Sequence, residues 1–280
     1  WISRVMLQHV FPYPSRFHLL ARLLQLYSKS GLSSFLRATG MLKRIGPEYA
    51  LAEELMPEIA LSDGLKLDNV YAAVGRPKGR VALFAGCVMN SILGGVNRST
   101  VDLLNAAGYD VAVPKYQVCC GALANHSGLQ STAAEMARTN VSAFPLDGID
   151  AVIVNASGCG AMLVDYPLLV EGAKDLSSKV QDLSSFLWSS SIAKRLTRRL
   201  DLRVGYDDPC HLLHAQGISR PPRILLEAVP GIELVDVEGA DECCGSAGVY
   251  NLTQHELSMK ILDRKMERVR QAELDVLITS

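Results

Sequence analysis

The stretch Val81-Ala-Leu-Phe-Ala-Gly86 is a short apolar run that ends in glycine, the pattern of a strand buried inside a sheet. Outward from it, segments with helical spacing of apolar residues alternate with further short apolar runs. We expect helices over 91–107 and 128–143, and strands over 110–113 and 151–154. Strands that alternate with helices predict an α/β fold with a parallel sheet.

The second half of the chain repeats the first at an almost constant spacing. Cys210 follows Cys87 by 123 positions, and a second Cys-Cys-Gly triplet follows the first by 124. The apolar segment 276–280 matches 152–156, again 124 positions apart. Three matches at nearly one offset predict a duplicated unit. The two triplets are Cys119-Cys120-Gly121 and Cys243-Cys244-Gly245.

The repeat divides the chain into parts. We predict two tandem homologous α/β modules with parallel sheets, over 81–198 and 199–280, preceded by a basic helical segment and linker over 1–80. The second module is expected to be truncated before its last loop, because the counterpart of Cys159 would fall at about position 283. The chain begins with Trp1 and shows no signal peptide, so we expect an internal piece of a longer, reduced, intracellular protein.

All seven cysteines follow predicted strands. The carboxyl ends of parallel strands meet at one edge of a sheet, so the thiols of each module are expected to meet there. Two adjacent cysteines reach one site only if the chain turns sharply, which the glycine after each pair permits. Thiolates without carboxylates suit zinc or an iron–sulfur cluster, and the lack of paired C-x-x-C knuckles favours the cluster, more so in the second module. The predicted metal ligands of the first module are Cys87, Cys119, Cys120 and Cys159, and the predicted cofactor ligands of the second are Cys210, Cys243 and Cys244.

Two other uses of cysteine fit this pattern less well. A single buried cysteine is usually a small apolar side chain, but that does not explain a set that recurs together with its triplet. Seven cysteines in 280 residues are too few for a disulfide scaffold, and nothing indicates an oxidising compartment. We therefore interpret both sets as metal-binding.

The charge of the chain excludes one class of function and marks one segment. Lys and Arg number 28 and Asp and Glu 29, which argues against a nucleic-acid partner. Residues 1–47 contain seven basic residues and no acidic one, with Phe17, Leu20, Leu24 and Tyr27 at helical spacing. This basic amphipathic helix either packs on the main body or faces an anionic membrane or a partner subunit. No apolar stretch is long enough to cross a membrane.

Several other polar residues have plainer interpretations. Asp207 and Asp208 are expected in a solvated turn, and His126 in a loop. His211 and His214 are expected to cap the next helix or to hydrogen-bond near the site rather than to bind metal, because the first module has no histidine at the matching positions. No nucleotide-binding loop and no nucleophile elbow occurs, so no catalytic residue is predicted.

Three sequence segments around the cysteines are distinctive: Asn155-Ala-Ser-Gly-Cys-Gly-Ala161, Pro209-Cys-His-Leu-Leu-His-Ala-Gln216 and Cys243-Cys-Gly-Ser-Ala-Gly-Val-Tyr250. With the triplets and their spacing, they resemble the cysteine-rich CCG domain family. That family includes a subunit of heterodisulfide reductase, lactate-utilisation iron–sulfur proteins and the iron–sulfur subunit of glycolate oxidase. The chain is most similar to the last of these, over nearly its whole length.

The resemblance implies an electron-transfer subunit of a glycolate oxidase or dehydrogenase. A 2-hydroxy acid would be oxidised on a flavoprotein partner, and the electrons would pass to a membrane or quinone acceptor. The resemblance also implies a [4Fe–4S] cluster, with zinc in the first module of some members. It further implies a cytoplasmic protein that lies peripherally on the inner face of the cell membrane.

One position departs from the pattern of heterodisulfide reductase. There the last element is a C-x-x-C, which gives five thiols for a non-cubane cluster, whereas here the first position of that element is Ala156. Four thiols suit an ordinary [4Fe–4S] cluster or a zinc ion. A disulfide-reducing catalytic subunit and a zinc-stapled assembly scaffold remain the alternatives to electron transfer.

Overall fold

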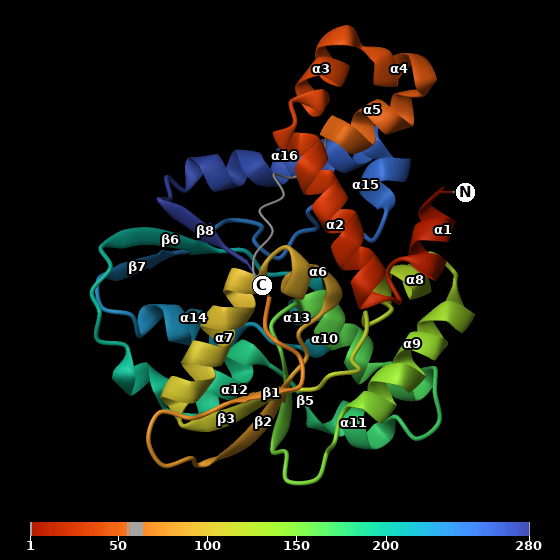
Figure 1. The fold of residues 1–280 in the computed structure, drawn as a ribbon. Helices are drawn as coiled ribbons and strands as arrows, with labels where there is room; N and C mark the ends of the chain where they lie inside the picture. Colours follow the sequence, from red (N-terminus) through yellow and green to blue (C-terminus); the bar gives the residue numbers. More distant parts are fainter. Residues whose placement is uncertain (1, 55, 57–63, 280) are drawn as a thin grey trace.

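The structure is a computed structural model that describes residues 2–54, 56 and 64–279, and it contains two sheets (Figure 1). The first sheet has the order β1-β3-β2-β4-β5, in which only β1 is antiparallel to its neighbour. The second has the order β7-β6-β8 and is parallel throughout. The strands are β1 (Asn69–Tyr71), β2 (Gly79–Leu83), β3 (Tyr109–Val113), β4 (Ala151–Val154), β5 (Val180–Asp182), β6 (Leu202–Tyr206), β7 (Ile232–Val235) and β8 (Val276–Ile278).

Helices precede and connect these strands, as the α/β prediction requires. The N-terminal helices are α1 (Ile2–His9), α2 (Pro14–Lys29), α3 (Leu32–Thr39), α4 (Met41–Ile45) and α5 (Pro47–Glu54). Those of the first module are α6 (Cys87–Ser91), α7 (Gly94–Ala107), α8 (Ala122–His126), α9 (Gln130–Ala143), α10 (Ser157–Val164), α11 (Lys174–Lys179) and α12 (Leu183–Ser189). Those of the second are α13 (Cys210–Gln216), α14 (Arg220–Glu227), α15 (Tyr250–Thr253) and α16 (His255–Gln271).

The first sheet is buried on both faces. On one face Val81, Leu83 and Ile153 pack against apolar residues of α7 and α12. On the other face Phe84 and Val152 join a core formed with α9, α10 and α11, and this core includes the thiols of the first triplet. Alternate side chains of one strand point to opposite faces, so a strand covered on both sides has a continuous apolar sequence, as the stretch that begins at Val81 does.

The strand order confirms the predicted repeat. The central strands run β3-β2-β4 in the first sheet and β7-β6-β8 in the second. In both, an aspartate accepts a hydrogen bond from the backbone N–H of an arginine in the first strand: Asp150 Oδ2 from Arg80 at 2.9 Å, and Asp275 Oδ2 from Arg203 at 2.8 Å. The duplication therefore extends to side-chain contacts at the strand ends.

The register corrects the alignment of the third strand. Val81 pairs with Ala151, and its counterpart Val204 pairs with Val276. Ala151 and Val276 are thus equivalent, 125 positions apart, and the match of 152 with 276 is wrong by one residue. One extra residue lies between the triplet and the third strand of the second module. Ser280, the end of that match, lies outside the described residues.

Other elements differ from the prediction. β1 lies in the segment taken as linker and adds an antiparallel edge to the first sheet, and β5 was not predicted. The expected helix over 91–107 is two helices, α6 and α7, which meet at residues 92–93. Residues 57–63 of the expected linker lie outside the described part of the chain.

The N-terminal helices lie over the cysteine edge of the first module. In Figure 1, α2 runs from α6 and α8 toward α3, α4 and α5, which project beyond the sheets. α1 packs against α8 and α2 against α6, with Leu7 and Phe17 buried.

An ion pair joins α3 to α5: Arg37 Nε lies 2.6 Å from Glu53 Oε2. Hydrogen bonds, first that from Arg37, hold the pKa of the Glu53 carboxyl below its usual value.

Both triplet glycines have a left-handed backbone and lie against the second helix after the triplet, α9 or α16, and this close packing yields a prediction. A Cβ on Gly245 would lie 2.5 Å from the Ser258 carbonyl oxygen of α16, whereas Gly217, also at positive φ, has open space. Gly217→Ala should cost about 1–2 kcal/mol of unfolding free energy through backbone strain alone. Gly245→Ala should cost at least about 2 kcal/mol more through the clash. Urea unfolding of the metal-free variants measures both, and equal losses would contradict the packing of this turn.

Candidate metal centre

The four cysteines of the first module come together at the carboxyl edge of its sheet. Cys87 begins α6 directly after β2, Cys119 and Cys120 lie between β3 and α8, and Cys159 lies on α10 after β4. Their side chains are buried or half-buried. The pKa values of the Cys87, Cys119 and Cys120 thiols are shifted chiefly by one another and, for Cys120, also by Cys159, so the four side chains are neighbours at this edge. Their role as metal ligands stays a prediction.

Interactions within this set shift the pKa values of three of the thiols in different directions. Hydrogen bonds from Cys120 and Cys87, and then from backbone N–H groups, hold the pKa of the Cys119 thiol well below its usual value. Hydrogen bonding to Cys119, together with burial, raises the pKa values of the Cys87 and Cys120 thiols. Cys119 is the preferred thiolate, and its neighbours keep protons that a bound metal would displace.

Two buried side chains fix the backbone of the first triplet. Asn140 of α9 accepts a hydrogen bond from the Val118 N–H at 2.8 Å and donates to the Cys119 carbonyl at 3.1 Å. Tyr166 donates to the Cys120 carbonyl at 2.9 Å and accepts from Asn140. Burial, followed by the charge of Cys120, raises the pKa of the Tyr166 hydroxyl. Sequence reasoning missed both residues, because neither carries a metal-ligand signature of its own.

The three cysteines of the second module occupy matching places in the chain. Cys210 begins α13 after β6, and Cys243 and Cys244 follow β7. The Gly245 N–H donates to Cys243 Sγ at 3.3 Å, and Cys210 Sγ lies 3.8 Å from His211 Nδ1. Cys210 and Cys243 are exposed. In contrast to the buried or half-buried set of the first module, two of these three cysteines therefore face solvent.

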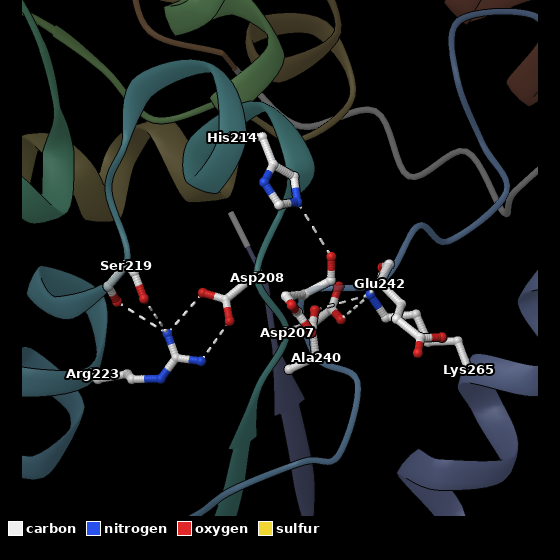
Figure 2. A network of polar contacts seen from close by, with 9 residues as sticks. Asp207, Asp208, His214, Ser219, Arg223, Ala240, Glu242 and Lys265 are labelled. Carbon is white, nitrogen blue, oxygen red and sulfur yellow. Dashed lines mark hydrogen bonds and ion pairs between the residues drawn. The ribbon is translucent and has the colours of Figure 1, made fainter.

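A charged network joins the segments that lead into Cys210 and into the second triplet, and it corrects one expectation (Figure 2). Asp208 is only 6% exposed, and Arg223 binds both of its carboxylate oxygens at 2.7 and 2.6 Å. Asp207 Oδ1 lies 2.5 Å from Lys265 Nζ. The expected solvated turn at Asp207 and Asp208 is therefore wrong: both carboxylates pair with cationic side chains, of which Lys265 is buried and Arg223 half-buried. His214 contacts the Asp241 carbonyl at 3.4 Å, in the loop before the triplet.

The two modules meet beside their cysteines. α10, which carries Cys159, packs against α13, which begins with Cys210. A Cβ on Gly160 would lie 2.9 Å from Gln216 Oε1, so the glycine permits this close approach. The His126 and His211 rings stack across the boundary with centroids 5.5 Å apart. Burial, followed by the charge of His126, lowers the pKa of His211. The two cysteine sets are therefore neighbours.

The donor set of the first module fits a soft metal or an iron–sulfur cluster. Cys119 and Cys120 lie in an apolar core with Cys87 and Cys159 packed against it, and backbone hydrogen bonding within the triplet helps to lower the pKa of the Cys119 thiol. Hydrogen bonds of this kind to sulfur tune cluster potentials. Within the described ranges, the structure contains no group of three His, Cys, Asp or Glu side chains that is arranged to hold a metal ion. Metal binding would therefore need rearrangement of these neighbouring side chains.

Comparison with known families agrees with this geometry. The family described as a cysteine-rich domain matches residues 81–164 and 204–280, and the linker region of the glycolate oxidase iron–sulfur subunit matches residues 1–56. The chain belongs to the cysteine-rich CCG domain family. The two matched ranges contain the two cysteine sets, and the linker match covers the N-terminal helices.

Individual relatives extend the comparison. The probable glycolate oxidase iron–sulfur subunit of Bacillus subtilis is 38% identical over 97% of this chain, which covers 63% of that relative. A subunit of the fumarate reductase (CoM/CoB) of Methanothermobacter marburgensis is 31% identical over 87% of the chain, which covers 49% of it. Lactate utilization protein A of Geobacillus kaustophilus is 32% identical over 71% of the chain, which covers 85% of it. The chain thus spans about half to two thirds of the first two relatives.

The contacts of Tyr166 give a prediction for the first triplet. Tyr166→Phe removes the donor to the Cys120 carbonyl and leaves that buried oxygen unpaired, so it should cost about 1–3 kcal/mol of unfolding free energy. Tyr116→Phe is the matched control, because Tyr116 is exposed and its loss should stay within about 0.5 kcal/mol. Urea unfolding of the metal-free protein measures both variants. Equal stability of the two would show that the hydroxyl does not support the turn.

Proposed function

We propose that the chain is the iron–sulfur electron-transfer part of an oxidoreductase that oxidises a 2-hydroxy acid. The observation that carries the proposal is the set of four neighbouring cysteines in the first module, at the edge where the sheet presents its loops. The similarity to a probable glycolate oxidase iron–sulfur subunit supports glycolate as the substrate of the complex. The acid would be oxidised on a flavoprotein partner, from which this chain would take electrons one at a time.

The cofactor that suits this role is a [4Fe–4S] cluster. Cys87, Cys119, Cys120 and Cys159 would hold one cluster, or a zinc ion that organises the first module. Cys210, Cys243 and Cys244 would supply ligands in the second module. The contact between α10 and α13 supports two centres near each other, as electron transfer between them would require.

The two alternatives make different use of the same thiols. A zinc-stapled scaffold needs only the four thiols of the first module and no redox change. A disulfide-reducing subunit needs a substrate disulfide at the cluster. The N-cap of α10 is Ala156, so a fifth thiol is absent from the position where heterodisulfide reductase has one.

Metal analysis and EPR spectroscopy of the intact protein, isolated without oxygen, test the proposal. We expect iron and inorganic sulfide, and an EPR signal that is observed on reduction. Cys119→Ala should remove the signal of the first module, and Cys243→Ala that of the second. Zinc without iron would overturn the proposal in favour of the scaffold. A new signal that needs an added disulfide would overturn it in favour of the reductase.

The location of the protein is a second part of the proposal. In the described part of the chain, no helix combines the length and the apolar character needed to cross a membrane. The apolar stripe that the sequence predicts on α2 faces the interior of the protein. Phe17 is buried, and Leu20, Leu24 and Tyr27 are half-buried. The same helix exposes a different row, made of Leu19, Leu23 and Leu26.

We infer that this outer face of α2 lies on the anionic inner surface of the cell membrane, near a membrane or quinone acceptor. Arg16, Arg22 and Lys29 are exposed on the same helix. Each basic residue near an anionic surface contributes about 1 kcal/mol, and the leucines would enter the headgroup region. The binding would be peripheral and sensitive to salt.

Sedimentation of the intact protein with anionic vesicles tests this location. Reversing Arg16, Arg22 and Lys29 to Glu should abolish binding at low salt without a change in unfolding free energy. Reversing Lys66, Arg76 and Lys174, which are exposed elsewhere, is the matched control with the same net charge, and this variant should still bind. Equal binding by the two variants, or none by the native protein, would leave α2 as a surface for a partner subunit.

A further inference from the structure

The internal repeat identifies a pair of equivalent residues outside the cysteine sets. Asn140 on α9 and Lys265 on α16 are 125 positions apart, the offset that the register gives for β4 and β8. The packing of the triplet glycines supports the same offset. A Cβ on Gly121 would meet Ala133, and a Cβ on Gly245 would meet Ser258, again 125 positions on. The helices α9 and α16 are therefore matched residue by residue behind the two triplets.

Asn140 and Lys265 hold the same loop in the two modules. Asn140 binds backbone groups of Val118 and Cys119, at 2.8 and 3.1 Å. Lys265 Nζ donates to the carbonyl oxygens of Ala240 and Glu242, at 3.1 and 2.6 Å (Figure 2). Both side chains are buried, with 0% exposure for Asn140 and 5% for Lys265. Each side chain comes from the helix packed behind the triplet. Each hydrogen-bonds to the backbone that leads into that triplet.

The two modules differ in the charge of this support. Asn140 is neutral, whereas Lys265 carries a charge that Asp207 balances at 2.5 Å. In the first module, the position equivalent to Asp207 is occupied by Phe84, which is apolar and buried. A buried ion pair costs desolvation, and a neutral group would hold the loop without that cost. The charge therefore calls for an explanation beyond support of the loop.

We propose that Lys265 is the positioning residue of the second triplet and that its charge cancels that of Asp207 beneath the centre held by Cys210, Cys243 and Cys244. The part that concerns that centre rests on the proposed function. A centre built from thiolates is anionic, and reduction makes it more negative. An uncompensated Asp207 would oppose both the binding of metal by the thiolates and the reduction of the centre.

Amide hydrogen exchange of the metal-free intact protein tests the positioning role. The probes are the backbone N–H groups of Ala240, Glu242 and Gly245, which are hydrogen-bonded within the loop. Lys265→Met should speed their exchange by on the order of tenfold or more, since the Glu242 carbonyl loses its Lys265 donor and the Ala240 carbonyl keeps only the Asp208 N–H. Lys265→Asn, which copies the first module, should restore part of the protection. Lys260→Met, exposed on the same helix, is the control, and exchange in Lys265→Met no faster than in this control would overturn the positioning role.

Binding of Cd²⁺ tests the charge without any redox step. In a Cys119→Ala/Cys120→Ala background only the second module keeps its full set of thiols, and thiolate absorption reports the bound ion. Lys265→Asn should weaken Cd²⁺ binding by on the order of tenfold, and Lys265→Asn with Asp207→Asn should recover it, because the double variant is neutral again. Equal affinities for the two variants would overturn the charge role.

The midpoint potential of the second centre gives an independent reading when iron is present. Lys265→Asn should lower it, the double variant should return it toward the native value, and the signal of the first module should not move. An unchanged potential in Lys265→Asn would contradict the charge role. A native protein without a redox-active second centre would contradict the proposed function instead, and the exchange and Cd²⁺ measurements would still decide the role of Lys265.

Discussion

The turn that directs two adjacent cysteines into one site is the constraint on which the rest of the structure depends. Neighbouring residues of an extended chain point in opposite directions, so the pair can serve one centre only if the backbone reverses at once. Gly121 and Gly245 do this at φ of 88° and 81°, and each lies against a later helix of its module, α9 or α16. A residue with a Cβ would meet that helix, so the position of the helix and the identity of the glycine determine each other.

The same constraint explains why so much of each module is organised around its triplet. The carbonyl and amide groups that a sharp turn leaves unpaired need partners from elsewhere, because buried backbone polar groups are costly when unsatisfied. In the first module Asn140 and Tyr166 supply them, and in the second Lys265 does. α1 and α2 then lie over the edge of the first module and bury Leu7 in the core that contains its thiols. The cysteines are thus part of the core as well as candidate ligands.

Much of this fold could be predicted from the sequence, and the rest depends on packing that the sequence does not display. Apolar runs revealed the central strands, and the offset between Cys87 and Cys210 revealed the duplication. The one-residue error at Val276 arose because two apolar runs align equally well at either offset. The sequence therefore does not reveal the residue inserted between the triplet and the strand. Asp207 and Asp208 looked like a solvated turn, since their partners Lys265 and Arg223 are distant in sequence. The inward face of α2 was equally undetermined, because leucines cover two of its faces.

Duplication keeps a backbone and lets the two copies differ around it. The two sheets have the same strand order, the same aspartate at the strand end and the same glycine in the triplet. The differences lie one layer behind the cysteines. In the first module the support is neutral, and the four cysteines lie in or against an apolar core. In the second the support is ionic, and two of the three cysteines are exposed. Because the ligands are alike and their surroundings are not, two centres in this chain would differ in potential and in access to solvent, as two steps of one electron path require.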